Sequence, residues 1–254
     1  MMKKIQIKKD NQIFSRFEMK YLLNKNLSLN IQNEIKKFMT YDGYINKDFS
    51  EKKYYVRSIY FDNDSYSNFN EKVDGLKIRH KFRIRTYSSK LTKNSTLYLE
   101  EKGRLNQRTY KVRSKISKND LYLFFEQKNM FQLKKNYKDK MLVEKFIFES
   151  LKKNINPNVI VDYERSPFVN NTGLYFRLTF DSKIRSCVSN DLYLINNQWK
   201  ECLSGYEILE VKFDTTIPAW FQKIIQSYEL KRLSISKYVL GMEASGLAED
   251  FEGK

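Results

Sequence analysis

Histidine, cysteine, proline and glycine are scarce in this chain, which has 1 His, 2 Cys, 3 Pro and 8 Gly among 254 residues. The single histidine, His80, falls on the apolar face of a predicted strand, so we expect it to be packed rather than catalytic. Cys187 and Cys202 fit no zinc-ligand spacing and no Cys-x-x-Cys motif, and we expect reduced thiols. Neither a Gly-x-x-x-x-Gly-Lys-Ser/Thr loop nor a Gly-x-Gly-x-x-Gly motif occurs, so any phosphate must be held by side chains.

Long apolar runs are also missing. No stretch approaches the 18 or so apolar residues that a membrane-spanning helix needs. The basic N-terminus, residues 1–10, lacks the apolar segment of a signal peptide. With no linker and no repeat in the chain, we predict one domain over residues 1–254, with its core at about 12–243, in a cytoplasmic protein.

Acidic residues are few relative to basic ones: 30 Asp and Glu against 47 Lys and Arg, a formal net charge of +17. Such an excess indicates an anionic partner, such as phosphate polymers, nucleotides, nucleic acid or a membrane surface. Lysine abundance alone can reflect an AT-rich genome and needs no ligand. Arginine is more telling, because its planar guanidinium binds oxyanions through two parallel hydrogen bonds. Nine of the 12 arginines lie in predicted strands, namely Arg16, Arg57, Arg79, Arg83, Arg85, Arg108, Arg113, Arg165 and Arg177.

The segment 77–87 is the most informative in the chain. As a β-strand it places Arg79, Lys81, Arg83 and Arg85 on one face and the more apolar His80, Phe82, Ile84 and Thr86 on the other. Four adjacent cations repel one another. A surface strand would leave them in water, whereas a closed barrel would point them inward, toward a polyanion.

Alternating patterns predict eight strands: Gln12–Leu22, Tyr54–Asp62, Ile78–Tyr87, Thr96–Lys102, Asn106–Ser114, Val159–Arg165, Leu174–Asp181 and Tyr206–Phe213. Residues 103–105 are predicted to form a hairpin turn, and Leu192–Ile195 a ninth short strand. Helical periodicity predicts helices over Ser28–Met39, Asp139–Lys153, a segment starting near Pro218, and Ser236–Leu247.

Most of these strands carry charge on one face. A half-exposed antiparallel sheet gives the same alternation, with its polar faces in water. Over eight strands, however, the polar faces repeatedly hold Arg and Lys together with a few carboxylates. We therefore favour an α+β fold in which an eight-stranded antiparallel β-barrel has a charged lumen and flanking helices.

Carboxylates recur on the same strand faces. Glu18, Glu100 and Glu210 each stand two residues from a lysine, which are Lys20, Lys102 and Lys212. Each glutamate either pairs with its lysine or supplies oxygen to a hard divalent cation of the kind that phosphoryl transfer uses. Glu210 is the strongest metal candidate.

Several short segments, in this order, resemble a known family. They are Arg16-Phe17-Glu18-Met19-Lys20-Tyr21, Ile59-Tyr60-Phe61-Asp62-Asn63, Arg83-Ile84-Arg85, Glu100-Glu101-Lys102, Tyr163-Glu164-Arg165, Arg177-Leu178-Thr179-Phe180-Asp181, Leu209-Glu210-Val211-Lys212 and Ser236-Lys237-Tyr238. The series resembles the VTC domain, the polyphosphate polymerase branch of the triphosphate tunnel metalloenzymes in the CYTH-like superfamily. The resemblance implies an eight-stranded antiparallel tunnel with flanking helices.

The resemblance also implies a function: transfer of the γ-phosphate of ATP to a growing polyphosphate chain with Mn²⁺ or Mg²⁺. By position it implies phosphate-binding cations at Lys20, Arg83, Arg85, Lys102, Lys111, Arg165, Arg177 and Lys237, with Lys212 beside them. Glu210 would be the metal ligand and Glu18 a second. ATP and inorganic polyphosphate would be the ligands, and a separate membrane protein the partner that brings the chain to a membrane.

Two positions depart from the family pattern. Ser234 stands where a second lysine often precedes the final one, and Arg16 stands where other tunnel enzymes have the first glutamate of Glu-x-Glu-x-Lys. The lost carboxylate argues against a hydrolase dependent on two metals. The alternatives are a tunnel hydrolase that cleaves inorganic or nucleoside triphosphates, and a non-catalytic polyanion-binding module. Nucleic acid is disfavoured, because most aromatic residues fall on the apolar strand faces.

Overall fold

A computed structural model describes residues 16–42, 52–135, 137, 140–170, 175–193 and 198–249. Its centre is an antiparallel sheet with the strand order β1-β10-β8-β7-β3-β4-β5-β6, to which the short strands β2 and β9 add. The strands are β1 (Phe17–Asn24), β2 (Met39–Tyr41), β3 (Tyr54–Asp62), β4 (Ile78–Thr86), β5 (Leu97–Leu105), β6 (Arg108–Ile116), β7 (Asn156–Asn170), β8 (Phe176–Val188), β9 (Lys200–Glu201) and β10 (Tyr206–Phe213).

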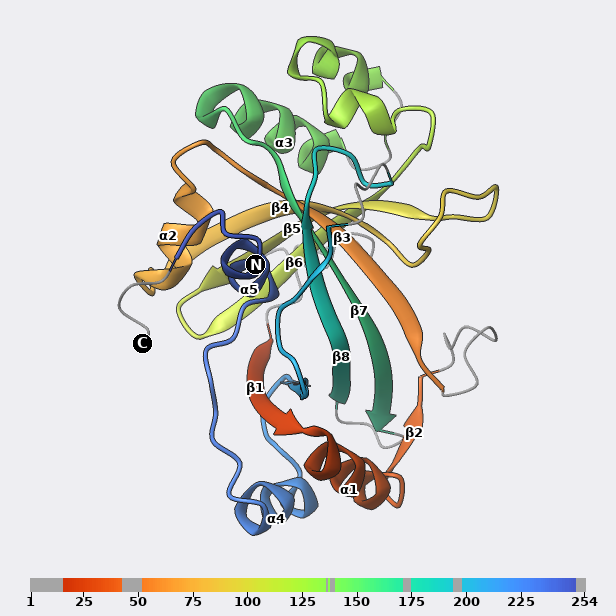
Figure 1. Ribbon diagram of the computed structural model, residues 1–254, viewed down its shortest axis with the longest axis vertical. Coiled ribbons are helices and arrows are strands. Elements are labelled where there is room, and N and C mark those ends of the chain that lie inside the picture. The colour runs from red at the N-terminus through yellow and green to blue at the C-terminus, as the bar shows by residue number, and fades with distance from the viewer. Residues whose placement is uncertain are drawn as a thin grey trace, which may run out of the picture.

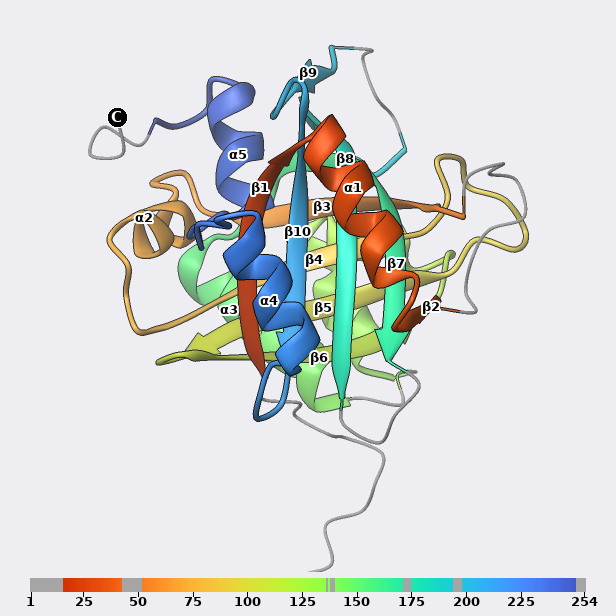
Figure 2. The same ribbon diagram turned by 90° about the horizontal axis from the view of Figure 1, so that it is seen from below.

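The sheet curls so that its two halves cross. Strands β1, β10, β8 and β7 run across β3, β4, β5 and β6 at a steep angle (Figure 2). The two edge strands come together at one isolated bridge in the described residues, where the backbones of Arg16 and Thr109 exchange hydrogen bonds of 2.9 and 3.0 Å. The predicted α+β fold with eight antiparallel tunnel strands and flanking helices is thus confirmed, although the wall is not a continuously hydrogen-bonded ring.

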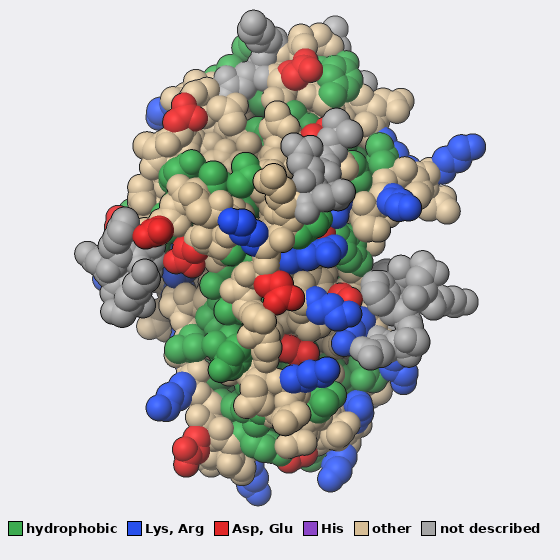
Figure 3. Space-filling model, in the orientation of Figure 1, with side chains coloured by type: hydrophobic (Ala, Val, Ile, Leu, Met, Phe, Trp, Pro, Cys, Tyr) green, Lys and Arg blue, Asp and Glu red, His purple; other side chains and the backbone are tan. Residues whose placement is uncertain are grey.

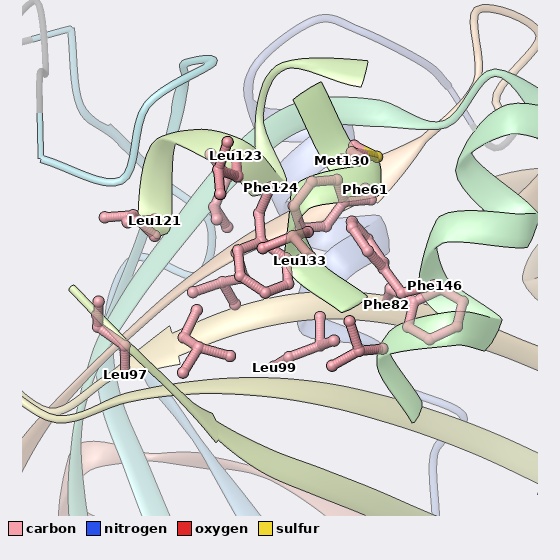
Figure 4. Packing of buried hydrophobic residues seen from close by; sticks show 14 of the residues in the cluster. Phe61, Phe82, Leu97, Leu99, Leu121, Leu123, Phe124, Met130, Leu133 and Phe146 are labelled. Atoms are coloured by element: carbon pink, nitrogen blue, oxygen red, sulfur yellow. The ribbon is translucent and has the colours of Figure 1, made fainter. Parts of the chain in front are cut away.

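The helices are α1 (Lys25–Ile35), α2 (Ser67–Val73), α3 (Lys140–Lys153), α4 (Ala219–Ser227) and α5 (Lys237–Ala244), with 3₁₀ turns at Leu121–Phe124 and Gln127–Lys135. Helices α1, α3 and α4 cover the outside of the two halves (Figure 1), whereas α2 and α5 contribute to the inner core cluster. The outward faces of β4 and β5 pack under α3 and the 3₁₀ turns, where Phe82, Leu99, Phe124 and Phe146 interdigitate (Figure 4). The other half packs under α1 and α4 through residues such as Phe221.

A third core cluster lies on the inward side of the strands. Val56, Val161 and Ile208 share strand faces with residues that line the interior, and they pack against Tyr238 and Met242 of α5. This helix approaches β7 closely, because a Cβ atom at Gly241 would lie 2.7 Å from a methyl carbon of Val161. Helix α5 therefore fills part of the interior with apolar side chains and leaves the rest to the charged residues.

Strand positions follow the sequence pattern closely, with one misplaced turn. The predicted turn at residues 103–105 is wrong: Leu105 pairs with Arg108, so the turn is Asn106–Gln107, and Asn106 has φ 54°. Gly103 belongs to the strand. A Cβ atom there would stand 2.0 Å from the ring of Tyr110 on β6, so the glycine makes room for that ring rather than for a turn.

Other boundaries shifted for local reasons. Helix α1 begins at Lys25, where the Asn24 side chain accepts from the backbone N–H of Leu27 at 2.9 Å, and it ends before Met39, which belongs to β2. The predicted start of the first strand, residues 12–15, lies outside the described residues. Of the predicted short strand Leu192–Ile195, Leu192 and Tyr193 form a bend, and the remainder lies outside the described part. Helix α2 and the 3₁₀ turns had no predicted counterpart.

Candidate functional site

A large cavity of about 1990 Å³ lies between the inward faces of the two half-sheets and extends over the β5–β6 edge to residues such as Lys145. The eleven residues predicted to bind phosphate or metal line it: Glu18, Lys20, Arg83, Arg85, Lys102, Lys111, Arg165, Arg177, Glu210, Lys212 and Lys237. They come from β1, β4, β5, β6, β7, β8, β10 and the first residue of α5. The period of two along each strand brings them together, because every second residue of a strand faces the same side.

Two arginines of β4 form the most rigid part of the cavity wall. Arg83 is 7% exposed and donates two hydrogen bonds, of 2.9 and 2.7 Å, to one carboxylate oxygen of Glu100 on β5. Arg85, 6% exposed, donates to the hydroxyls of Ser58 and Tyr163 at 2.9 and 3.1 Å. The hydroxyl of Tyr60 accepts from Arg83 at 3.1 Å. Both guanidinium groups are thus fixed in the absence of any ligand.

The opposite half of the wall centres on Glu210. Its carboxylate accepts hydrogen bonds of 2.8 Å from both Lys212 and Lys237 and one of 3.1 Å from Arg165. Arg165 also forms a bidentate pair with Asp181 at 2.6 and 2.7 Å. Burial opposes ionisation of Glu210, but these cations outweigh it and hold the pKa of the carboxyl well below its usual range. Glu210 is therefore an anion in the folded protein.

Glu18 links the two halves. Its carboxylate lies 3.1 Å from the ammonium of Lys102 on β5 and 3.2 Å from that of Lys20 on its own strand. Burial raises the pKa of Glu18, but Lys102 and Lys20 together lower it by more, so the carboxyl stays ionised. Burial lowers the pKa of Lys102 to about 7, although Glu18 raises it, and lowers the pKa of Lys111 to about 8, although Glu100 raises it.

The donor set fits one kind of metal ion. In the described part of the chain, no three His, Cys, Asp or Glu side chains stand close enough to hold a metal by themselves. Two ionised carboxylates do converge, since the ammonium of Lys20 lies 3.2 Å from Glu18 and 3.9 Å from Glu210. Mg²⁺ and similar hard cations use one or two carboxylates and take their other ligands from water and substrate phosphates. The residues therefore fit an ion that binds together with phosphate, and do not form a protein cage.

Sequence reasoning missed several residues that shape the cavity. Tyr60, Tyr163 and Asp181 anchor the arginines, and their position on the inward strand faces was the available signal. Lys81 lies on the predicted face, with its ammonium 4.9 Å from the ring centre of Tyr238, and makes no ion pair with a described carboxylate. Burial and nearby cations, Lys102 first among them, lower its pKa well below the usual value.

Ser234 stands where the family pattern often has a lysine, and another lysine, Lys72, reaches this position in space. Lys72 of α2 donates to the hydroxyl of Ser234 at 3.0 Å and to its carbonyl at 3.3 Å, and both residues line the cavity. At the other departure, Arg16 stacks on Tyr175 at 3.6 Å and lies 3.3 Å from Asp214. Arg177 lies 2.6 Å from Asp42 near the edge of the cavity.

Charges on the outside are paired in a different way. The buried Arg57 forms a bidentate pair of 2.9 Å with Asp162 and packs under Trp199, so its role is outside the cavity. Arg108 stacks on Phe17 at 4.9 Å. Over β7 and β8, basic and acidic side chains are interspersed on the surface (Figure 3). Among the described residues that line the cavity, cations outnumber carboxylates.

Solved structures share this architecture. A candidate adenylate cyclase from Bacillus halodurans is 13% identical, with a TM-score of 0.50 over 88% of this chain and 93% of its own. A Hippeastrum protein described as an adenylyl cyclase with a dominant triphosphatase activity is 12% identical, with a TM-score of 0.50 over 91% of this chain and 96% of its own. At these identities the likeness establishes the fold alone.

Fold and cavity together have the architecture of the triphosphate-tunnel fold: an antiparallel wall around inward-facing cations. The model of the VTC domain matches residues 15–245, and the chain belongs to that family. No curated protein sequence matched the chain. Among the described residues, no helix combines the length and apolar character needed to cross a bilayer.

Proposed function

We propose that this protein is a metal-dependent polyphosphate polymerase that transfers the γ-phosphate of ATP to a growing inorganic polyphosphate chain. One observation carries the proposal: Arg83, Arg85 and Arg165, all less than 9% exposed, aim fixed guanidinium groups into one cavity. Glu100, Asp181 and Glu210 balance part of this buried charge, but the cations on the cavity wall outnumber its carboxylates, which favours an anionic ligand. Membership of the VTC domain family supports the same reading.

Phosphoryl transfer suits such a site, because it depends on positioning and on charge stabilisation more than on covalent chemistry by the protein. In our proposal Arg83, Arg85 and Arg165 hold the triphosphate of ATP, while Lys20, Lys102 and Lys237 neutralise the acceptor chain. The remaining predicted cations, Lys111, Arg177 and Lys212, flank these two groups. The terminal oxygen of the acceptor forms a bond to the γ-phosphorus, the bond from that phosphorus to the β-bridging oxygen breaks, and ADP leaves. A divalent cation, when bound at Glu210 and Glu18, would neutralise charge between the phosphates.

Arg16 favours transfer over hydrolysis. It places a guanidinium where other tunnel enzymes have a first carboxylate, so one metal-binding oxygen pair is replaced by a cation on the cavity wall. Hydrolysis of triphosphates is the second candidate, favoured by the dominant triphosphatase activity of the Hippeastrum protein that shares the fold. The two reactions use the same phosphate-binding residues and differ in the nucleophile, which is a phosphate oxygen or water. A separate membrane partner and a cytoplasmic location remain part of the proposal.

The test is incubation of the purified protein with ATP and Mn²⁺, with ADP release and polyphosphate measured in parallel. Arg83→Ala and Glu210→Ala should abolish polymer formation. Arg185→Ala is the matched control, because this arginine lies on the outer face of β8, 4.5 Å from the Trp199 ring centre. Orthophosphate without polymer would replace the polymerase with the hydrolase. Tight polyphosphate binding with no ATP turnover, with or without metal, would leave a binding module.

A further inference from the structure

Three tyrosines from three neighbouring strands cluster at one end of the cavity. Tyr54 begins β3, Tyr87 directly follows β4, and Tyr98 lies near the start of β5; all three line the cavity. The rings of Tyr54 and Tyr87 meet edge to face with centres 5.7 Å apart, and those of Tyr87 and Tyr98 do so at 6.2 Å. The cluster therefore forms one continuous aromatic surface.

These rings differ from the other inward tyrosines. The hydroxyls of Tyr60 and Tyr163 accept hydrogen bonds from arginines, so those side chains serve as anchors. In the described part of the chain, the cluster's three hydroxyls make no hydrogen bond. Tyr54 packs beside the inner core, but Tyr87 and Tyr98 belong to no core cluster, and Tyr87 is 36% exposed. Tyr98 is half-buried, and neither the Tyr87 nor the Tyr98 hydroxyl anchors an arginine as those of Tyr60 and Tyr163 do.

The cluster continues the row of phosphate-binding arginines. The inward face of β4 runs through Arg79, Lys81, Arg83 and Arg85 and ends at Tyr87. Tyr98 pairs across the ladder with Arg85, and the guanidinium of Arg113 stacks 4.6 Å from its ring centre. At about 3.3 Å per residue, Tyr87 stands about 7 Å beyond Arg85 along the strand. A nucleotide has a matching layout, because its aromatic base is joined through a short polar spacer to a row of phosphates.

Resting on the function proposed above, we infer that Tyr87 and Tyr98, with Tyr54 behind them, form a stacking site for the nucleobase of a nucleoside triphosphate. Base–aromatic stacking tolerates any base, because every base has a π face. The site would fix the direction of the substrate: the base at the tyrosine end, the phosphates on Arg85 and Arg83, and the acceptor chain toward Lys81. It would also explain how the cavity accepts a nucleotide rather than inorganic triphosphate alone.

The test compares two ligands in metal-chelated buffer by titration calorimetry: ATP, which has a base, and inorganic tripolyphosphate, which has none. Replacing both rings in a Tyr87→Leu, Tyr98→Leu protein should weaken ATP binding about tenfold or more and leave tripolyphosphate binding within about twofold. Tyr98→Phe should keep the affinity for ATP, since stacking uses the ring. Tyr206→Leu, an exposed tyrosine outside the cavity lining, is the matched control.

Unchanged ATP binding in the double variant would overturn the inference, as would an equal loss for both ligands. If the double variant does not fold, the exposed single change Tyr87→Leu gives the same comparison with a smaller expected loss. A parent protein that binds tripolyphosphate but not ATP would refute the base site and leave a phosphate tunnel. A parent that binds neither ligand would refute the proposed function, and the base site with it.

Discussion

Replacing Glu100 with glutamine should make the protein less stable and yet improve its binding of phosphate. The carboxylate is fully buried and lies 2.7 Å from Arg83, 3.7 Å from Arg85 and 3.5 Å from Lys111. These cations outweigh its burial and keep the pKa of the carboxyl far below normal, so the native group is an anion. Glutamine keeps the shape and removes the charge. The two buried arginines and the more exposed Lys111 then lose their shared counter-ion, at a cost of about 3–5 kcal/mol. For a chain of this size that lowers the melting temperature on the order of 10 °C.

Tripolyphosphate should reverse this loss. A ligand at 100 times its dissociation constant stabilises a protein by about 2.7 kcal/mol, and the variant should gain more, because no carboxylate competes with the ligand for Arg83. The assay is thermal unfolding over a range of tripolyphosphate concentrations. Asp162→Asn is the matched control: this carboxylate is also buried and pairs with an arginine, Arg57, at 2.9 Å, but neither residue lines the cavity. Tighter tripolyphosphate binding in neither variant, or in both, would refute the assignment of Glu100 as an internal counter-ion.

Further outcomes follow from the same structure. Polyphosphate affinity should fall as the pH rises from about 6 to 9, because Lys102 and Lys111, whose pKa values are about 7 and 8, lose their charge. Calorimetry at several pH values measures this fall, and repeating it in more than one buffer detects the proton uptake linked to binding. Gly103→Ala should destabilise the protein by about 1–3 kcal/mol, since the new methyl would overlap the ring of Tyr110 2.0 Å away, and the penalty should largely vanish in a Tyr110→Ala background, as measured by urea unfolding. Asp62→Asn should cost about 1–3 kcal/mol, because this fully buried carboxylate accepts hydrogen bonds from the backbone at the start of α2 and from a tyrosine of α5. Unchanged unfolding midpoints would contradict the last two.

The alternation of charged and apolar residues along the strands was enough to predict which residues line the cavity wall. Alternation along β1, β4 and β10 placed Lys20, Arg83 and Glu210 on one side, and strand pairing carried that side inward. The pattern could not say which groups pair. Glu100 stands two residues from Lys102, but it binds Arg83 instead, because that arginine lies directly opposite it in the β4–β5 ladder. Register across strands is a long-range property that local spacing does not contain.

Gly103 and the tyrosine cluster illustrate the same limit. A glycine near a charged segment is typical of a turn, and only the ring of Tyr110 on the neighbouring strand reveals why it lies in β5. Tyr54 stands 33 positions before Tyr87, and Tyr98 stands 11 after it, so the rings come from β3, the residue after β4, and β5. Their contact depends on the order and register of β3, β4 and β5, which are neighbours in the sheet.

The neutral anchors of Arg85 have a mechanical consequence. Hydroxyls of Ser58 and Tyr163 hold its guanidinium through neutral hydrogen bonds, while the carboxylate of Glu100 lies 3.7 Å away and balances part of its charge. A long side chain that is ordered only when a ligand arrives loses up to about 2 kcal/mol of rotamer entropy, and here that loss is taken during folding. Lys81, in the middle of the same strand face, has no such hydrogen bond among the described residues. Along the row of cations on β4, the side chains of Arg83 and Arg85 are therefore positioned before any ligand binds, whereas in the described part of the chain the ammonium of Lys81 is held only by its contact with the Tyr238 ring.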